Sequence, residues 1–272
     1  AKQNTMTPEF MRTARKAVAA SVVLLKNDNR LLPITKESGK TVALIGPLMN
    51  DSINLNGEWA GLGDRKKSIP ILEGISEKYK ESAVKLLYSE GSSITETTPG
   101  KIAEAVAAAR RADVVVAAMG EDFNWSGEAA VRTDIRLPEP QRELLKALKA
   151  TGKPIVLVIL SGRPLDLSWE DENMDAILQA WFPGTQTGHG VADVIAGDYN
   201  PSARLVMSFP RNVGQIPIYY NQKNTGRPVD LSNEATDYKS NYLDNSITPL
   251  YPFGYGLSYT TFSISSVSAD KS

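Results

Sequence analysis

The chain has 272 residues, which is enough for one large α/β unit with a substantial hydrophobic core. Because 30 Lys and Arg residues balance 31 Asp and Glu residues, the net charge of −1 lacks the basic excess of a nucleic-acid-binding protein. The chain has no cysteine, which excludes thiolate nucleophiles, cysteine-ligated zinc and disulfides. Its longest apolar runs are too short to span a bilayer. From the charge balance we expect no nucleic-acid partner, and from the short apolar runs we expect no membrane partner.

The first predicted elements are a helix and a buried strand. Apolar residues recur at intervals of three and four over residues 8–26, which indicates one apolar face of a helix that begins after Thr7. Residues 41–47 form a short apolar run that ends in Gly-Pro, a pattern typical of a strand buried on both faces. Further runs of this kind follow at 84–91, 112–120, 154–162 and 175–181, with a possible last strand at 204–210.

Helical stretches lie between several of these runs, and strands that alternate with helices imply a mainly parallel sheet. Residues 102–111 are rich in alanine, and residues 139–150 carry leucines on one side. The predicted fold is therefore α/β, with a mainly parallel sheet of about six strands sandwiched between helices. We expect the linker and first helix in residues 1–38, the α/β sandwich in residues 39–215 and a C-terminal extended arm in residues 216–272.

Two common kinds of site have no support in the sequence. The loop after the first predicted strand lacks the glycines that wrap a pyrophosphate, which argues against nucleotide binding. The single histidine, His189, lies near a predicted helix start, and no G-x-S-x-G motif is present to pair with it. We expect His189 to be a polar residue near a helix N-terminus rather than a catalytic base.

The loop at residues 120–138 is the strongest candidate for chemistry. It leaves the carboxyl end of a predicted strand, where ligands gather in parallel sheets, and it is too long for an ordinary connection. Glu121 at the strand end is expected to accept hydrogen bonds, whereas Glu128 lies further out among small residues and suits a proton donor. The alternative is a solvated surface loop whose acids pair with Arg132 and Arg136.

Trp59 is the second unusual residue, because it is a large aromatic side chain among glycines in a polar loop. Sugar rings present C–H groups to such an indole face, so Trp59 can serve as a binding platform. Packing against a partner domain is the alternative, and the sequence alone leaves both open.

Eight segments of the chain occur together in the order "SVVLLKNDNRLLPI", "VALIGP", "NGEWAGLG", "ADVVVAAMGE", "SGEAAVRTDIRLPEPQRELL", "GKPIVLVILSGRPLDL", "ILQAWFPGTQTGHGVADVIAGDYNPSARLVMSFPRNVGQIPIYYN" and "PLYPFGYGLSYTTF". In this order they resemble the C-terminal α/β-sandwich domain of family 3 glycoside hydrolases, the β-glucosidases and their relatives. The resemblance covers nearly the whole chain and is closest to the periplasmic bacterial β-glucosidases.

This resemblance implies an active site shared between two domains. In the family, a preceding (β/α)₈-type barrel binds the non-reducing-end sugar and supplies an aspartate nucleophile, while the sandwich domain supplies the general acid/base glutamate. Matched residue by residue, that glutamate is Glu128, and Trp59 matches the aromatic residue of the leaving-group subsite. The barrel and its nucleophile are missing from this chain, and the family often continues into a fibronectin-type domain after the arm. The resemblance thus implies part of a larger retaining β-glucosidase, inactive alone, with no cofactor and no metal.

The implied partners are a β-glucoside or oligosaccharide substrate and the N-terminal barrel domain of the same enzyme, and the implied location is periplasmic or secreted. Two alternatives stay open. The chain can be a structural or sugar-binding module without chemistry, in which Trp59 matters and Glu128 does not. It can also be the same domain of a β-xylosidase, because the sugar is chosen mostly by the barrel.

Overall fold

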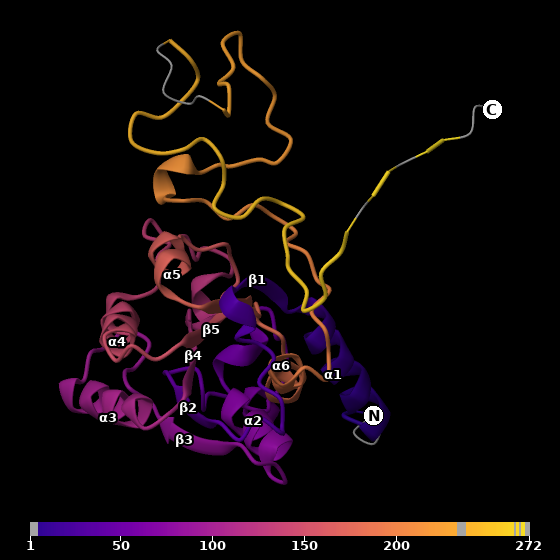
Figure 1. Cartoon of the computed structure of the whole chain (residues 1–272), viewed down its shortest axis with the longest axis vertical. Helices are drawn as coiled ribbons and strands as arrows, with labels where there is room; N and C mark the ends of the chain where they lie inside the picture. Colours follow the sequence, from indigo (N-terminus) through magenta and orange to yellow (C-terminus); the bar gives the residue numbers. More distant parts are fainter. Residues whose placement is uncertain (1–4, 233–237, 264, 267, 270–272) are drawn as a thin grey trace.

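The computed structural model describes residues 5–232, 238–263, 265–266 and 268–269, and its centre is a six-stranded sheet (Figure 1). The strands are β1 (Val23–Asn27), β2 (Thr41–Ile45), β3 (Lys85–Ser89), β4 (Val114–Gly120), β5 (Ile155–Leu160) and β6 (Ala176–Gln179). Their order across the sheet is β1-β6-β5-β4-β2-β3. The β1–β6 pairing is antiparallel and the other four pairings are parallel, which confirms the predicted α/β fold with a mainly parallel sheet.

Helices cover both faces of this sheet. They are α1 (Pro8–Ser21), α2 (Ile71–Tyr79), α3 (Pro99–Arg110), α4 (Glu139–Lys149), α5 (Ser168–Asn173) and α6 (Thr187–Ala196). One buried apolar cluster joins α1, α2 and α6 to one sheet face, and a second joins α3 and α4 to the other.

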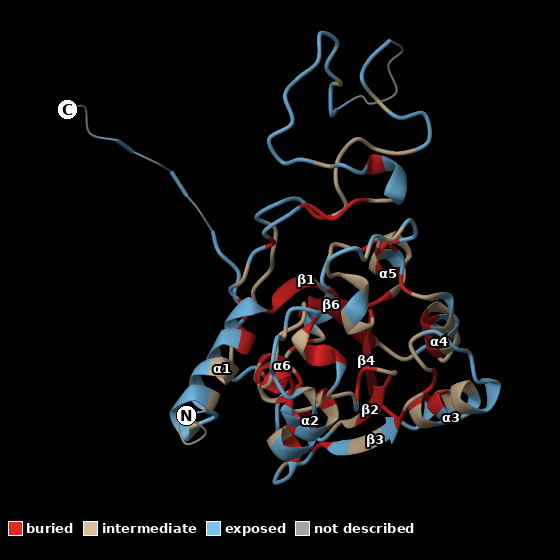
Figure 2. Ribbon diagram, turned by 180° about the vertical axis from the view of Figure 1, so that it is seen from behind, coloured by how far each residue is buried: buried red, intermediate tan, exposed pale blue. Residues whose placement is uncertain are grey.

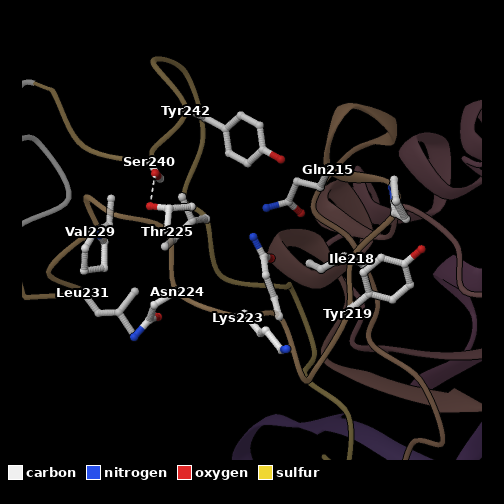
Figure 3. Close-up of a pocket in the computed structure, with 14 residues that line it drawn as sticks. Gln215, Ile218, Tyr219, Lys223, Asn224, Thr225, Val229, Leu231, Ser240 and Tyr242 are labelled. Atoms are coloured by element: carbon white, nitrogen blue, oxygen red, sulfur yellow. Dashed lines mark hydrogen bonds between the residues drawn. The ribbon is translucent and has the colours of Figure 1, made fainter.

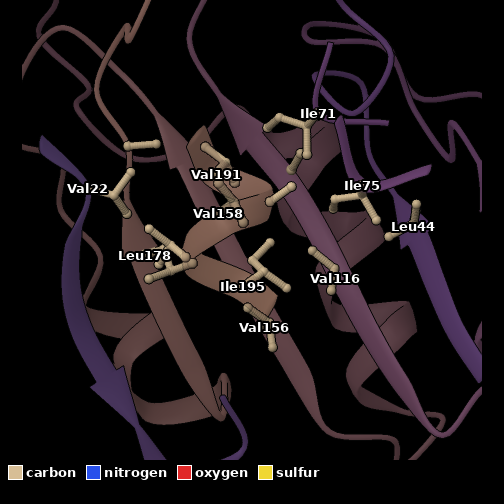
Figure 4. Close-up of a cluster of buried hydrophobic side chains, with 14 of the residues drawn as sticks. Val22, Leu44, Ile71, Ile75, Val116, Val156, Val158, Leu178, Val191 and Ile195 are labelled. Atoms are coloured by element: carbon tan, nitrogen blue, oxygen red, sulfur yellow. The ribbon is translucent and has the colours of Figure 1, made fainter. Parts of the chain in front are cut away.

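Alternation along the strands explains the two clusters. Successive side chains of a strand point to opposite faces, so Leu44 belongs to the first cluster and its neighbour Ile45 to the second. Figure 4 shows the first cluster, in which Val116 and Val158 of the sheet meet Ile75 of α2. Burying each such side chain stabilises the fold by about 1.5–3 kcal/mol. Because both faces of the sheet are buried, the strands are continuous apolar runs.

The N-terminal segment differs in one respect from its prediction. The helix begins after Thr7 as expected, and the Thr7 hydroxyl accepts a hydrogen bond from the Phe10 N–H group. It ends at Ser21 rather than continuing to residue 26, because residues 23–27 form β1 at the edge of the sheet. The run "VVLL" fits the helical spacing only in part, and its last three residues, Val23, Leu24 and Leu25, are buried on the two faces of this edge strand.

The possible strand at residues 204–210 does not form. Leu205 and Phe209 are buried and make backbone hydrogen bonds to residues 250–255, but the pairing is an isolated bridge between Phe209 and Tyr251 and not a strand. The edge of β6 that this segment would need is already paired with β1. The sixth strand of the sheet is therefore β1, and the prediction for residues 204–210 is wrong.

The C-terminal part first leaves the sheet and then returns to it (Figures 1 and 2). Residues 216–232 and 238–247 are largely exposed and project from the body. Residues further on pack back: Leu257 bridges Leu24 of β1, Tyr251 is 5% exposed, and the Tyr259 hydroxyl donates to the Val194 carbonyl. The division of the chain into linker, sandwich and arm remains a prediction. Among the described residues, no helix has the length and apolar character needed to cross a membrane.

Candidate functional site

The candidate site lies where the strand order of the sheet reverses. Strand β2 is flanked by β3 on one side and by β4 on the other, although β3 and β4 are consecutive in the chain. Ligands of open α/β sheets bind outside the carboxyl ends of the strands at such a reversal. The two loops that leave the carboxyl ends of β2 and β4 carry Trp59 and Glu128, respectively.

These two loops are in direct contact. Gly127 packs on Glu58 so closely that a Cβ atom on Gly127 would lie 2.2 Å from the Glu58 Cγ atom. The Phe123 N–H group donates to Asn54 Oδ1 at 2.8 Å, and the Arg65 guanidinium lies 3.8 Å from the centre of the Phe123 ring. The structure therefore brings the loop of Trp59 and the loop of Glu128 together at one rim of the sheet.

Trp59 points its indole mainly into solvent, with 74% of the residue exposed. Within the described part of the chain it is thus not a core side chain. Both expectations for Trp59, a sugar platform and packing against another domain, require such exposure.

Glu128 sits in a tight turn and is exposed. The Ala130 N–H group donates to the Gly127 carbonyl at 3.2 Å, which closes a four-residue turn with Glu128 at its second position. Ala129 at the third position has φ 59°, a left-handed conformation that is uncommon for a residue with a Cβ atom. The turn of Glu128 therefore has a hydrogen bond across it and a left-handed residue at its third position.

The other carboxylates of this loop are engaged. Glu121 is fully buried, and its carboxylate accepts hydrogen bonds from Arg132 Nη1 at 2.8 Å and from Arg163 Nε at 3.3 Å, which confirms the hydrogen-bonding role expected for it. The Asp122 side chain accepts from the Asn124 N–H group, and the Arg132 guanidinium also lies 4.5 Å from the centre of the Trp125 ring.

Asp134 forms an exposed pair with Arg136, whose Nε atom lies 2.9 Å from Asp134 Oδ1. The hydrogen bonds from Arg136 lower the pKa of Asp134 to about 2. Ion pairing of the loop acids with arginine thus holds for Glu121 and Asp134. Glu128 has no hydrogen-bond or ion-pair partner among the residues that the structure describes.

Arg163 is a component of the site that the sequence interpretation did not include. It follows β5, the strand beside β4, and besides Glu121 it binds the Ala130 carbonyl through Nη2 at 3.1 Å. Its position directly after the carboxyl end of a buried strand was a usable signal. The pairing of Arg163 with Glu121 could not be predicted, because the sequence does not show which strands are neighbours in the sheet.

His189 is involved in contacts between helices instead. Its Nδ1 atom lies 2.8 Å from Gln186 Oε1 and its Nε2 atom lies 2.8 Å from Glu77 Oε2 of α2. The predicted position near a helix start is confirmed, since His189 is in the first turn of α6. Over the described ranges, no group of three or more His, Asp and Glu side chains is placed to hold a metal ion.

Two of the cavities lined by described residues lie beside Arg163 and within the arm. A mostly apolar one of about 470 Å³ adjoins Arg132 and Arg163 and is lined further by Met207, Tyr220 and Phe253. The other, of about 510 Å³, lies within the arm (Figure 3), where the hydroxyls of Thr225 and Ser240 are 2.5 Å apart. Among the described residues that line the second cavity there is no carboxylate.

The chain is similar to one family model and to several curated glycosidases. The model of the glycosyl hydrolase family 3 C-terminal domain matches residues 22–259. The chain is 47% identical to a periplasmic β-glucosidase of Salmonella typhimurium, over 94% of this chain and 36% of that protein. It is 38% identical to a β-xylosidase of Formosa agariphila, over 95% of this chain and 35% of that protein.

The chain is also similar to the solved structure of a β-glucosidase. The β-glucosidase of Listeria innocua in complex with isofagomine superimposes with a TM-score of 0.90 at 41% identity, over 96% of this chain and 35% of that chain. The chain thus spans about a third of the length of each of these relatives.

Proposed function

The chain belongs to the family of glycosyl hydrolase family 3 C-terminal domains, and we propose that it forms one half of the active site of a retaining β-glucosidase, with Glu128 as the general acid/base. One observation carries the assignment of this residue. Of the carboxylates on the loop after β4, Glu128 is the exposed one that has no hydrogen-bond or ion-pair partner among the described residues, and its turn contacts the loop of Trp59. A proton donor must be able to reach a substrate, whereas Glu121 and Asp134 are held by arginines.

The other half of the site is proposed to be an N-terminal barrel domain that supplies the nucleophile. Support comes from the length of the relatives, of which this chain matches about a third. A retaining glycosidase needs two carboxyl groups about 5 Å apart, one to attack the anomeric carbon and one to protonate the leaving oxygen. Docking of the barrel against the β2–β4 rim would bring its nucleophile opposite Glu128.

The proposed reaction has two steps. First, the nucleophile's carboxylate oxygen bonds to the anomeric carbon, the bond to the leaving oxygen breaks, and the Glu128 proton passes to that oxygen. Next, Glu128 takes a proton from water as the water oxygen attacks the anomeric carbon and releases the nucleophile. Glu128 ends protonated, as it began.

Trp59 is proposed to bind the leaving group. Its exposed indole lies on the loop that touches the Glu128 turn. An aglycone sugar whose linking oxygen receives the Glu128 proton therefore has an aromatic face nearby. C–H groups of a sugar ring pack on such a face.

We propose a β-D-glucoside as substrate, because the relatives with 47% and 41% identity are named β-glucosidases. A β-xyloside is the second candidate, since a β-xylosidase is 38% identical. A periplasmic location is proposed on the name of the Salmonella typhimurium relative.

The test compares this chain alone with the full-length enzyme that joins it to the barrel, using cellobiose and 2,4-dinitrophenyl β-glucoside. We expect turnover from the full-length enzyme only. Glu128→Gln should lower kcat/KM for cellobiose by about 10²–10⁴-fold and should affect the glycosylation step of the activated substrate far less, because a good leaving group needs no proton. Azide, an anion that attacks without losing a proton, should restore turnover of the activated substrate and yield glucosyl azide.

Asp134→Asn is the matched control, because Asp134 is an exposed carboxylate on the same loop. Its activity should equal that of the unmodified enzyme on both substrates. An unaffected Glu128→Gln enzyme would favour a module without chemistry, and turnover by this chain alone would overturn the two-domain site. The ratio of rates on aryl β-glucoside and aryl β-xyloside decides between the two sugars.

A further inference from the structure

Arg163 connects the end of strand β4 to the turn that carries Glu128. Through Nε it binds the buried carboxylate of Glu121 at the end of β4, and through Nη2 it binds the carbonyl of Ala130 at the end of the turn. Its side chain is only 20% exposed, so both hydrogen bonds are shielded from most of the solvent. A guanidinium can make these two bonds in one plane, whereas an ammonium group is a point charge without that fork.

The backbone of Arg163 is itself fixed by buried polar groups. Gln179 at the end of β6 donates to the Ser161 hydroxyl at 3.0 Å, and this hydroxyl donates to the Arg163 carbonyl at 2.8 Å. Gln179 and Ser161 are both fully buried. A continuous chain of hydrogen bonds thus runs from β6 through the end of β5 to the turn of Glu128.

The turn is also bounded on its other side. Ser126 packs on Gly162, where a Cβ atom would lie 2.1 Å from the Ser126 hydroxyl, and Gly127 packs on Glu58. Because Ala129 has a positive φ, the turn needs surrounding contacts to keep its geometry. Arg163 supplies the contact at its carbonyl end.

We propose that Arg163 is a positioning residue for the general acid: by bridging Glu121 and the Ala130 carbonyl, it sets where the Glu128 carboxyl stands relative to the leaving oxygen. This inference rests on the proposed function of Glu128. Arg163 itself touches neither the substrate nor the reacting atoms in this role. A displacement of about 1 Å in a catalytic group can cost about a hundredfold in rate, so the bridge matters even though it is indirect.

The experiment uses Arg163→Lys in the full-length enzyme, which keeps the positive charge beside Glu121 and removes the fork. We expect kcat for cellobiose to fall about tenfold to a hundredfold, KM to change little, and glycosylation by 2,4-dinitrophenyl β-glucoside to fall less than about threefold. Ser161→Ala should act in the same direction with a smaller loss, because it loosens only the Arg163 backbone. Arg136→Lys is the matched control, since Arg136 is an arginine of the same loop paired to an exposed carboxylate.

The pattern across substrates separates positioning from general structural damage. Equal losses on both substrates, or no loss, would overturn the role of Arg163 if Glu128→Gln still shows its selective loss. If Glu128→Gln also fails to discriminate between the substrates, the proposed function falls and this inference with it. Unfolding midpoints of all variants show whether a loss of activity follows a loss of folded protein.

Discussion

Two carboxylates of the loop after β4 pair with arginines, and the two clusters differ most in burial. The Glu121 side chain is 0% exposed and is paired with Arg132 and Arg163, whose side chains are 21% and 20% exposed. The side chains of Asp134 and Arg136 are 54% and 50% exposed. Both clusters have short hydrogen bonds, of 2.8 Å and 2.6 Å, respectively.

The two clusters constrain the fold very differently. Glu121 and Arg163 lie at the ends of neighbouring strands, so their pairing connects β4, β5 and the turn of Glu128. Asp134 and Arg136 are two residues apart, so their pairing closes a short local ring and connects no other element. A buried pair that loses one partner leaves an uncompensated charge, whereas an exposed pair returns its groups to water.

The largest effect is expected for Glu121→Gln. The substitution keeps the shape of the side chain and leaves Arg132 and Arg163 without their counter-charge, which should destabilise the fold by about 3 kcal/mol. Denaturant unfolding of the variant and the unmodified protein at pH 7 measures this loss. A change below about 1 kcal/mol would show that solvent already compensates the two arginines.

The sequence predicted the fold class, but only part of the strand set and part of this site. The apolar runs of β2, β4, β5 and β6 predicted a parallel sheet, because a strand buried on both faces has no polar alternation. Strand order was not accessible, since adjacency depends on how helices pack over the sheet. For the same reason the reversal at β2 was not foreseen.

Within the site, the sequence indicated Glu128 and Trp59 but not what holds them. Glu121 was expected to accept hydrogen bonds, and the structure confirms this with Arg132 and Arg163. Arg163 is distant in the chain and arrives only because β5 lies beside β4. The composition of the loop after β4 cannot reveal a partner, such as Arg163, that follows a different strand.

The buried pair of Glu170 and Arg142 sharpens the comparison, because it is buried but lacks good geometry. Glu170 Oε1 lies 3.5 Å from Arg142 Nε and makes no hydrogen bond within the described ranges. Burial outweighs the attraction of Arg142 and raises the pKa of Glu170 to about 7. The folded chain therefore holds this proton more tightly than the unfolded chain, in which a glutamate has a pKa of about 4.3.

Stability should fall as pH rises between these two pKa values, because the native state binds more protons than the unfolded state there. Glu170→Gln cannot ionise and should be more stable than the unmodified protein by about 2 kcal/mol at pH 8, with the difference shrinking toward pH 5. Thermal or denaturant unfolding of both proteins at several pH values measures it. A difference that does not depend on pH would mean that Glu170 stays ionised in the folded protein.

The smallest effect is expected for Asp134→Asn. Arg136 lowers the pKa of Asp134, so the pair contributes stability above pH 4 that is lost as pH falls toward 2. Both side chains are about half exposed, and water and salt screen them, so the contribution should be below about 0.5 kcal/mol at neutral pH. Denaturant unfolding at pH 7 in low and high salt tests this. Because the pKa shift of Asp134 is large while its burial is small, a loss above about 1 kcal/mol would contradict the view that burial, not pairing alone, separates the two clusters. A negligible loss would agree with a structural role only for the buried pairing of Glu121 with Arg132 and Arg163.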